Sequence, residues 1–305
     1  MRANAHVVDI ETGDDGVRVH LEDGTVEEGA VVVGADGAHS ATRHIMQRLS
    51  GEAPTAMTTT FRGIFGKAHG MPGYSEGLFY EMRGPNMACQ SFGAGGWVHF
   101  AFLWKAGEPF TEHRTYSEKE MMQFAEQVPD MHPAPGVTFR ELWAHTDKSH
   151  ARLVNMEEGI VEGPWHHQRI VLLGDAVHKL TTITGQGVNA GMHSAAALAN
   201  ELRRAVRADS SPDTAQIEDA FARYERSRRS TAATLCEVSE RVTRLVSWSS
   251  WFLWLFDRFL VGWMSQRPLL DRLAGLMARG QVLDYVPFAD PESEVPWVNT
   301  APADE

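Results

Sequence analysis

A stretch near the middle of the chain carries glycines, a carboxylate and amides at the spacing of a cofactor site. Gly174-Asp175-Ala176-Val177-His178 is followed by Gly185-Gln186-Gly187-Val188-Asn189. A glycine-rich helix start leaves backbone N–H groups open to an electron-rich or anionic atom. A carboxylate at the end of a strand accepts hydrogen bonds from sugar-like hydroxyls. A cofactor that has both kinds of group therefore suits this stretch.

The elements that would position these residues are a strand, a loop and a helix. Residues 170–173 form a short, continuous apolar run, which is typical of a strand buried on both faces. Beyond Gly187, apolar residues recur at helical spacing as far as Leu202. An ordinary strand and helix, with glycines used only for turning, would show the same pattern.

A second group of polar residues follows an earlier apolar run. Residues 30–34 read Ala-Val-Val-Val-Gly and lead into a loop with Asp36, Gly37 and Arg43. The run predicts a buried strand, and the loop places a carboxylate and a basic side chain after it. A tight turn at Asp36-Gly37, with Arg43 at a helix end, would account for the same residues without a cofactor.

Together the two segments resemble the FAD-binding motifs of single-component flavoprotein monooxygenases of the aromatic-hydroxylase type. The resemblance implies that Asp175 holds the ribityl chain, and that the helix start at 185–189 faces the pyrimidine end of the flavin. Asp36, Gly37 and Arg43 resemble the Asp-Gly motif, whose aspartate and arginine help to hold FAD and contribute to NADPH binding. The motifs follow in the family's order, about 130 residues apart, and the resemblance extends to about Arg204.

The resemblance implies FAD as the cofactor and NAD(P)H as the co-substrate that reduces it. It implies a monooxygenase that uses O2 to hydroxylate or epoxidise an apolar small molecule. The most similar branch comprises fungal enzymes of terpenoid and meroterpenoid biosynthesis, so we expect a greasy secondary metabolite as substrate. Two other hypotheses stay open. One is a redox-inactive descendant that binds, cyclises or isomerises a substrate, and the other is a non-catalytic partner protein.

The sequence departs from the family pattern in three places. It has no Gly-x-Gly-x-x-Gly turn for the FAD pyrophosphate, so we expect about the first hundred residues of the family pattern to be missing. The parallel sheet would then lack its central strand, and this chain would hold FAD weakly or not at all. Thr182 replaces a proline of the family loop, and Ser194 lies near the position of an aspartate, which weakens the inferred site.

We predict a mixed α/β fold with an incomplete Rossmann-like FAD-binding domain, an inserted antiparallel-sheet substrate domain and a helical C-terminal region. The predicted boundaries are 1–57 and 166–210 for the FAD-binding domain, 58–165 for the substrate domain, 211–290 for the helical region and 291–305 for a loose acidic tail. Residues 5–10 and 17–21 are expected to start a β-meander. Residues 118–128 are expected to form a helix that ends at Pro129, and residues 137–143 another strand.

The predicted substrate domain supplies two candidate catalytic residues. Arg62 could face the flavin or a substrate oxyanion, and Tyr80 could donate a hydrogen bond to a substrate carbonyl or phenol. No motif fixes either role, and a structural place in a strand is the alternative for both. The aromatic side chains of this region could line an apolar pocket or simply form a core.

Composition narrows the class of partner. A net charge of -12 with no basic stripe argues against nucleic acid. Two distant cysteines form neither a disulfide framework nor a metal cluster, and the pair His166-His167 lacks further ligands at metal spacing, so we expect no metal site. The N-terminus does not resemble a signal peptide, which favours an intracellular protein.

The C-terminal region combines a long helix with the most apolar window of the chain. Residues 213–246 alternate apolar and arginine-rich faces, as a long surface helix does. Residues 248–264 are rich in tryptophan, but Asp257 and Arg258 interrupt them, so a membrane span is not expected. A helix at a membrane surface and a helix buried at a domain junction both fit. Enzymes of the resembled branch often have hydrophobic C-terminal segments, which favours membrane contact by residues 248–264.

Overall fold

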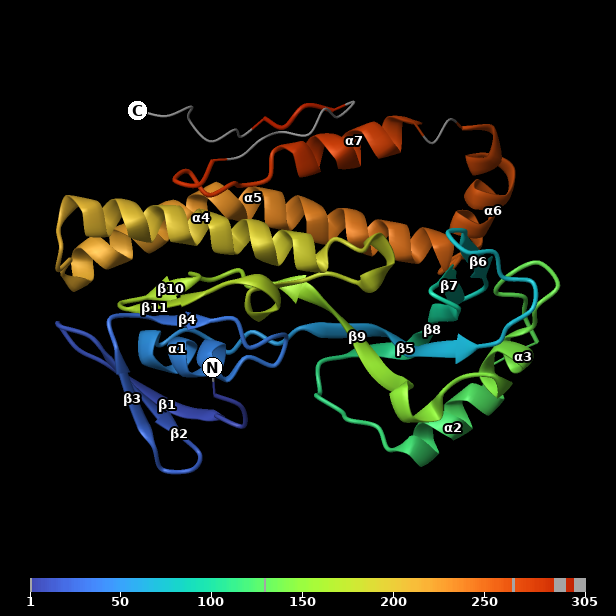
Figure 1. Ribbon diagram of the computed structural model, residues 1–305, viewed down its shortest axis with the longest axis horizontal. Coiled ribbons are helices and arrows are strands. Elements are labelled where there is room, and N and C mark those ends of the chain that lie inside the picture. Colours follow the sequence, from blue (N-terminus) through green and yellow to red (C-terminus); the bar gives the residue numbers. More distant parts are fainter. Residues whose placement is uncertain (1, 129, 265–266, 288–294, 299–305) are drawn as a thin grey trace.

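In this computed structural model the chain forms three β-sheets, and two long helices lie over one side of them (Figure 1). The structure describes residues 2–128, 130–264, 267–287 and 295–298. Helices and strands are both abundant, so the predicted mixed α/β class is confirmed.

The first sheet is a three-stranded antiparallel meander near the N-terminus. Its strands are β1 (Val7–Thr12), β2 (Val17–Leu21) and β3 (Val26–Gly29). The predicted start of a meander is therefore confirmed. The chain then forms β4 (Val32–Gly34) and helix α1 (Ala41–Ser50). The Asp-Gly loop, residues 35–40, lies between them.

The second sheet brings the two predicted motifs to the same edge. Its order is β10 (His166–His167), β11 (Ile170–Leu172) and β4, and β11 pairs with β4 in parallel. Since the carboxyl ends of parallel strands lie side by side, the loops after Gly34 and Leu172 are neighbours. Helices α4 (Gly187–Ala208) and α5 (Thr214–Val246) lie side by side over this sheet, and the predicted long helix is confirmed (Figure 1).

The third sheet has six antiparallel strands and forms the body of the predicted substrate domain. Its order is β12 (His178–Lys179), β9 (Arg152–Ile160), β5 (Thr58–His69), β8 (Trp97–Phe110), β7 (Met87–Ala94) and β6 (Phe79–Gly84). The short β12 belongs to the loop after Asp175, and His178 pairs with Ile160 of β9. This loop, residues 174–186, is called the Gly-Asp loop below, and it is hydrogen-bonded to the substrate-domain sheet.

Helices cover one face of this third sheet. Helix α2 (Glu118–Gln127) is confirmed, whereas Pro129 lies outside the described residues. The strand predicted at 137–143 is wrong, because Phe139–Ala144 forms helix α3. Thr138 accepts a hydrogen bond from the Glu141 N–H, and the Glu141 carboxylate accepts one from the Thr138 N–H. This capping box starts the helix and outweighs the local β propensity.

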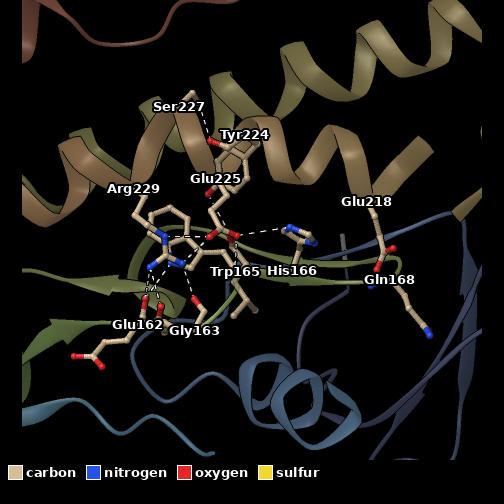
Figure 2. A network of polar contacts seen from close by, with 12 residues as sticks. Glu162, Gly163, Trp165, His166, Gln168, Glu218, Tyr224, Glu225, Ser227 and Arg229 are labelled. Carbon is tan, nitrogen blue, oxygen red and sulfur yellow. Dashed lines mark hydrogen bonds and ion pairs between the residues drawn. The ribbon is translucent and has the colours of Figure 1, made fainter. Parts of the chain in front are cut away.

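Charged side chains fasten α5 to the segment that enters the second sheet (Figure 2). Arg229 donates from Nη2 to the Gly163 carbonyl at 2.6 Å and to the Glu225 carboxylate at 2.7 Å. Glu225 also accepts from the Trp165 N–H at 2.9 Å, and Glu218 accepts from the Gln168 N–H at 2.6 Å. Trp165 is fully buried in the core cluster that joins α4 and α5 to β11. These contacts fix the position of the strand that leads to Asp175.

The C-terminal region continues with α6 (Trp251–Phe259), η4 (Val261–Trp263) and α7 (Arg267–Ala278), and shorter 3-10 turns are η1 (Lys148–His150), η2 (Gly174–Ala176) and η3 (Thr182–Thr184). Helix α6 has no buried residue, and Trp263 is 92% exposed. None of the helices among the described residues combines the length and apolarity needed to cross a bilayer. Of the predicted tail 291–305, only 295–298 are described.

Candidate functional site

The predicted Asp-Gly motif is a tight turn that caps a helix. The Asp36 carboxylate accepts hydrogen bonds from the N–H and the hydroxyl of Thr42, both at 3.0 Å, and from the Ser40 hydroxyl. Gly37 has a φ of 86°, which favours glycine. Asp36 therefore orders the loop and the start of α1, while its exposed surface leaves room for a further donor.

Arg43 joins this turn to the Gly-Asp loop. It is 2% exposed and donates from Nη2 to the Ala38 carbonyl at 2.6 Å and from Nη1 to the Ala176 carbonyl at 2.7 Å. Burial lowers the pKa of Arg43, although the nearby Asp36 carboxylate opposes this shift. Since both guanidinium contacts go to backbone oxygens of the two motifs, Arg43 holds the site together from behind.

The Gly-Asp loop begins at a position whose backbone conformation favours glycine. Gly174 has a φ of 62°, and Asp175 follows it in the 3-10 turn η2. The Asp175 carboxylate forms an ion pair with Lys179, yet its side chain is 35% exposed. It can therefore accept further hydrogen bonds from a ligand on its open side.

The start of α4 is an open helix N-terminus. Gly185 has a φ of 64°, and Gln186 is the N-cap residue without a side-chain hydrogen bond to the helix. The first turn contains no acidic residue, and a Cβ at Gly185 or Gly187 would meet nothing within 4 Å. The first N–H groups of this helix, from Gly187 to Asn189, are therefore accessible to an electron-rich ligand atom.

These features fit the flavin half of FAD. The parallel pairing of β4 and β11 places both motifs at one edge, where Asp175 offers a carboxylate and α4 offers N–H donors. Sugar-like hydroxyls suit the former, and the electron-poor helix start suits pyrimidine oxygens. The cofactor roles of Asp36, Gly37, Arg43, Gly174, Asp175 and residues 185–189 stay predictions.

Behind the Gly-Asp loop lies a buried basic cluster. Arg228 is 1% exposed and donates from Nε to the Ser194 hydroxyl at 3.5 Å, and the His178 Nε2 lies 3.3 Å from the same oxygen. Burial and the Arg228 charge lower the pKa of His178 to about 4. Within the described residues, no carboxylate forms an ion pair with Arg228, and its Nη2 has no hydrogen-bond partner. The cluster is therefore short of negative charge.

A cavity of about 490 Å³ lies on the sheet face that the Gly-Asp loop covers. Its apolar walls include Phe65, Phe79 and Phe92, and Thr182 of the loop lines it as well. The strand register explains the lining, because Phe79, Phe92 and His99 form one cross-strand row. Residues paired across strands share one face of a sheet, so this row projects towards the loop.

Arg62 and Tyr80 lie on the opposite face of this sheet. The Arg62 guanidinium carbon is 5.4 Å from the Phe110 ring centroid and 5.8 Å from that of Tyr116. Tyr80 packs edge-on against Tyr74, 5.4 Å between centroids, in the cluster beneath α2 and α3. The structure does not bring either residue to the Gly-Asp loop, so it does not support their predicted catalytic roles.

Sequence reasoning missed the polar residues that do face the cavity. Gln90 donates from Nε2 to the Ile183 carbonyl at 3.1 Å and to the Glu81 carboxylate at 3.0 Å, which ties the sheet to the loop. The His99 ring stacks on Phe92 with centroids 5.3 Å apart. Strand alternation was visible in the sequence, but it did not indicate which face the loop would cover.

Comparisons with known proteins show the family to which the chain belongs. Residues 1–239 match the model of the FAD binding domain family. The FAD-dependent monooxygenase srdH of Neurospora crassa is 36% identical over 97% of this chain, which covers 71% of srdH. The FAD-dependent monooxygenase dpasE of Apiospora sacchari is 31% identical over 93% of this chain, which spans 62% of dpasE.

A solved structure shares the fold. HpxO of Klebsiella pneumoniae, in complex with FAD and uric acid, superposes with a TM-score of 0.71 at 21% identity, covering 90% of this chain and 67% of HpxO. At this identity the likeness concerns the fold alone. The family match and the sequence relatives show that this chain belongs to the FAD-dependent monooxygenases that contain the FAD-binding domain.

Proposed function

We propose that this chain provides the flavin side of the FAD site and the substrate cavity of a monooxygenase that hydroxylates or epoxidises an apolar small molecule. The observation that carries the proposal is the place of Thr182. This residue lines the cavity and lies in the loop between Asp175 and the α4 N-terminus. The proposed cofactor and substrate sites therefore share one loop.

The residues of this chain bind, orient and shield. Asp175 would accept hydrogen bonds from the ribityl hydroxyls, and the N–H groups at the start of α4 would donate to the pyrimidine oxygens. When bound and reduced by NAD(P)H, FAD supplies the activation of O2 and the transfer of one oxygen atom. The phenylalanines of the cavity would hold an apolar substrate and exclude water from it.

Polar groups at the cavity would orient the substrate. His99 and Gln90 project from neighbouring strands into the lining, and Gln90 is held by two acceptors. Such fixed polar groups select one orientation of an otherwise apolar ligand. This arrangement suits a prenylated or terpenoid compound with one oxygen function.

A substitution that places a charge at the wall of the cavity tests the proposed substrate site. Phe79 lies at the cavity in edge strand β6, and its neighbour Leu78 is exposed without lining it. With FAD, NADPH and a prenylated phenol as probe, oxygen insertion is followed by mass spectrometry. Phe79→Glu should raise the probe KM at least tenfold, about 1.4 kcal/mol. Leu78→Glu is the matched control, and equal effects of the two variants would contradict the cavity assignment.

We also propose that α6 and η4 contact a lipid surface. Trp251, Phe252, Phe259 and Trp263 are exposed on one short segment. Asp257 interrupts the apolar window, but its side chain is only 6% exposed. Its carboxylate pairs with Arg83 at 2.5 Å and accepts a hydrogen bond from the Trp248 indole at 2.7 Å. The acidic group therefore leaves the outer surface to aromatic side chains, which favour the membrane–water interface.

A further inference from the structure

Three potential metal ligands from distant segments meet beside the Asp-Gly loop. His39, His113 and Glu157 each offer one ligand atom, and these three atoms lie within 4.8 Å of one another. The His39 Nε2 is 2.9 Å from the Glu157 Oε1. The His39 and His113 rings are in contact, with centroids 3.7 Å apart. No two of these residues are close in sequence, which is why spacing along the chain did not indicate them.

The three residues come from both predicted domains. His39 lies in the loop between β4 and α1, three residues after Asp36. His113 lies in the segment between β8 and α2, and Glu157 lies in β9, paired with Thr59 of β5. The cluster therefore spans the junction between the FAD-binding part and the substrate-domain sheet.

Glu157 is a largely buried carboxylate that no lysine or arginine within the described residues pairs with. Its side chain is 12% exposed, and within the described part of the chain its one ion-pair partner is His39. The next residue, Glu158, is equally buried but pairs with Arg244 at 2.8 Å. A poorly hydrated carboxylate is stabilised by a nearby positive charge. A metal ion bound to Glu157 and the two histidines would supply that positive charge.

We propose that His39, His113 and Glu157 bind a zinc ion. Two imidazole nitrogens and one carboxylate oxygen form a recognised three-ligand zinc set, with water in the fourth position. Ligand atoms around tetrahedral zinc lie about 3.3 Å apart, given bonds of about 2.0 to 2.2 Å. The present spread of ligand atoms is closed by small rotations of side chains, and the two histidines are exposed enough to turn.

The ion would act as a structural link. It would hold the loop that contains Asp36 against strand β9 and so fix the junction of the two domains. This role goes beyond the proposed monooxygenase function and does not depend on FAD. Zinc binding releases protons from its histidine ligands, so the affinity of the site should fall in acid.

The test is a titration of the tag-free protein with ZnCl2 in a calorimeter, repeated with Co²⁺, whose visible absorption reports tetrahedral coordination. We expect one ion per chain. His113→Ala should weaken binding at least tenfold, and Glu157→Gln should do the same. Zinc should raise the Tm of the unchanged protein but not that of His113→Ala. Because His113 lies outside the strands and helices, this variant is expected to fold, which circular dichroism checks.

His150→Ala is the matched control. His150 also contacts a carboxylate, at 2.7 Å from Asp147, but it belongs to no group of three ligands within the described residues. Its substitution should leave the zinc affinity unchanged. The proposal is overturned if the protein binds no zinc, if His113→Ala binds zinc as tightly as the unchanged protein, or if His150→Ala causes an equal loss.

Discussion

Arg43 donates from Nη1 to the carbonyl oxygen of Ala176 at 2.7 Å, although 133 residues separate the two in sequence. The same guanidinium holds the Ala38 carbonyl, so one buried side chain fixes the two loops that follow β4 and β11. A motif arginine with this geometry works through the backbone. Through these two carbonyl oxygens it fixes the loops that contain Asp36 and Asp175 relative to each other.

Replacing Arg43 should therefore cost stability. Arg43→Met keeps the bulk of the side chain but leaves the Ala38 and Ala176 carbonyls without their charged donor. Hydrogen bonds to charged groups contribute about 1.5 to 3 kcal/mol each, so we expect the free energy of unfolding in urea to fall by at least about 2 kcal/mol.

The control for this prediction lies in the same helix. Arg48 of α1 is exposed and pairs with Asp9 on the surface, so Arg48→Met should change the free energy of unfolding by less than about 1 kcal/mol. If the two variants are equally stable, Arg43 does not clamp the loops.

Ser194→Asp should stabilise the protein. The new carboxylate would lie where the Ser194 hydroxyl now accepts from Arg228, and it would supply the negative charge that this buried cluster lacks. A buried arginine deprived of its partner costs about 3 to 5 kcal/mol, so regaining one should raise the Tm by several degrees. Calorimetry measures the change. Ser194→Asn has the same shape without the charge, and a similar gain in that variant would show that charge is not the cause.

The exposed aromatic face of α6 and η4 predicts vesicle binding. The double substitution Trp251→Ser and Trp263→Ser removes two exposed indoles without touching the buried Asp257 contacts. We expect at least a tenfold loss of sedimentation with phosphatidylcholine vesicles, because burial of aromatic surface drives such binding. Val8→Ser with Val206→Ser removes exposed apolar residues elsewhere and should have no effect. Vesicle binding unchanged by the tryptophan substitutions would refute the lipid contact.

Periodicity and motifs predicted the strands and helices that dominate the fold, but not the direction in which side chains point. The helix at 213–246 and the strand at 170–173 were predicted within a residue or two because their apolar patterns are long or continuous. The candidate role of Arg62 could not be decided from the sequence, because alternation defines two faces of a strand without saying which one the Gly-Asp loop covers. The contact between Gln90 and the Ile183 carbonyl of the loop shows which face that is.

Long-range partners were equally invisible. The segment at 137–143 was expected to be a strand but contains helix α3, because the capping box of Thr138 and Glu141 outweighs the β-forming residues beside it. The cluster at His39 depends on three segments that meet only in the folded chain. Likewise, Asp257 interrupts the apolar window in sequence but turns inward to Arg83 in space.

The account rests most directly on the flavin site around Asp175, and a fluorescence titration of the chain with FAD tests it. We predict weak, saturable binding of FAD. Riboflavin should bind about equally well, because the contacts proposed for Asp175 and the α4 N-terminus involve only the flavin ring and the ribityl chain. Asp175→Ala should weaken FAD binding at least tenfold, about 1.4 kcal/mol. Asp147 is a carboxylate near the surface of the predicted substrate domain, and Asp147→Ala should leave the FAD affinity unchanged. Equal FAD affinity of Asp175→Ala and the unchanged chain, or no binding of flavin by either, would contradict the account.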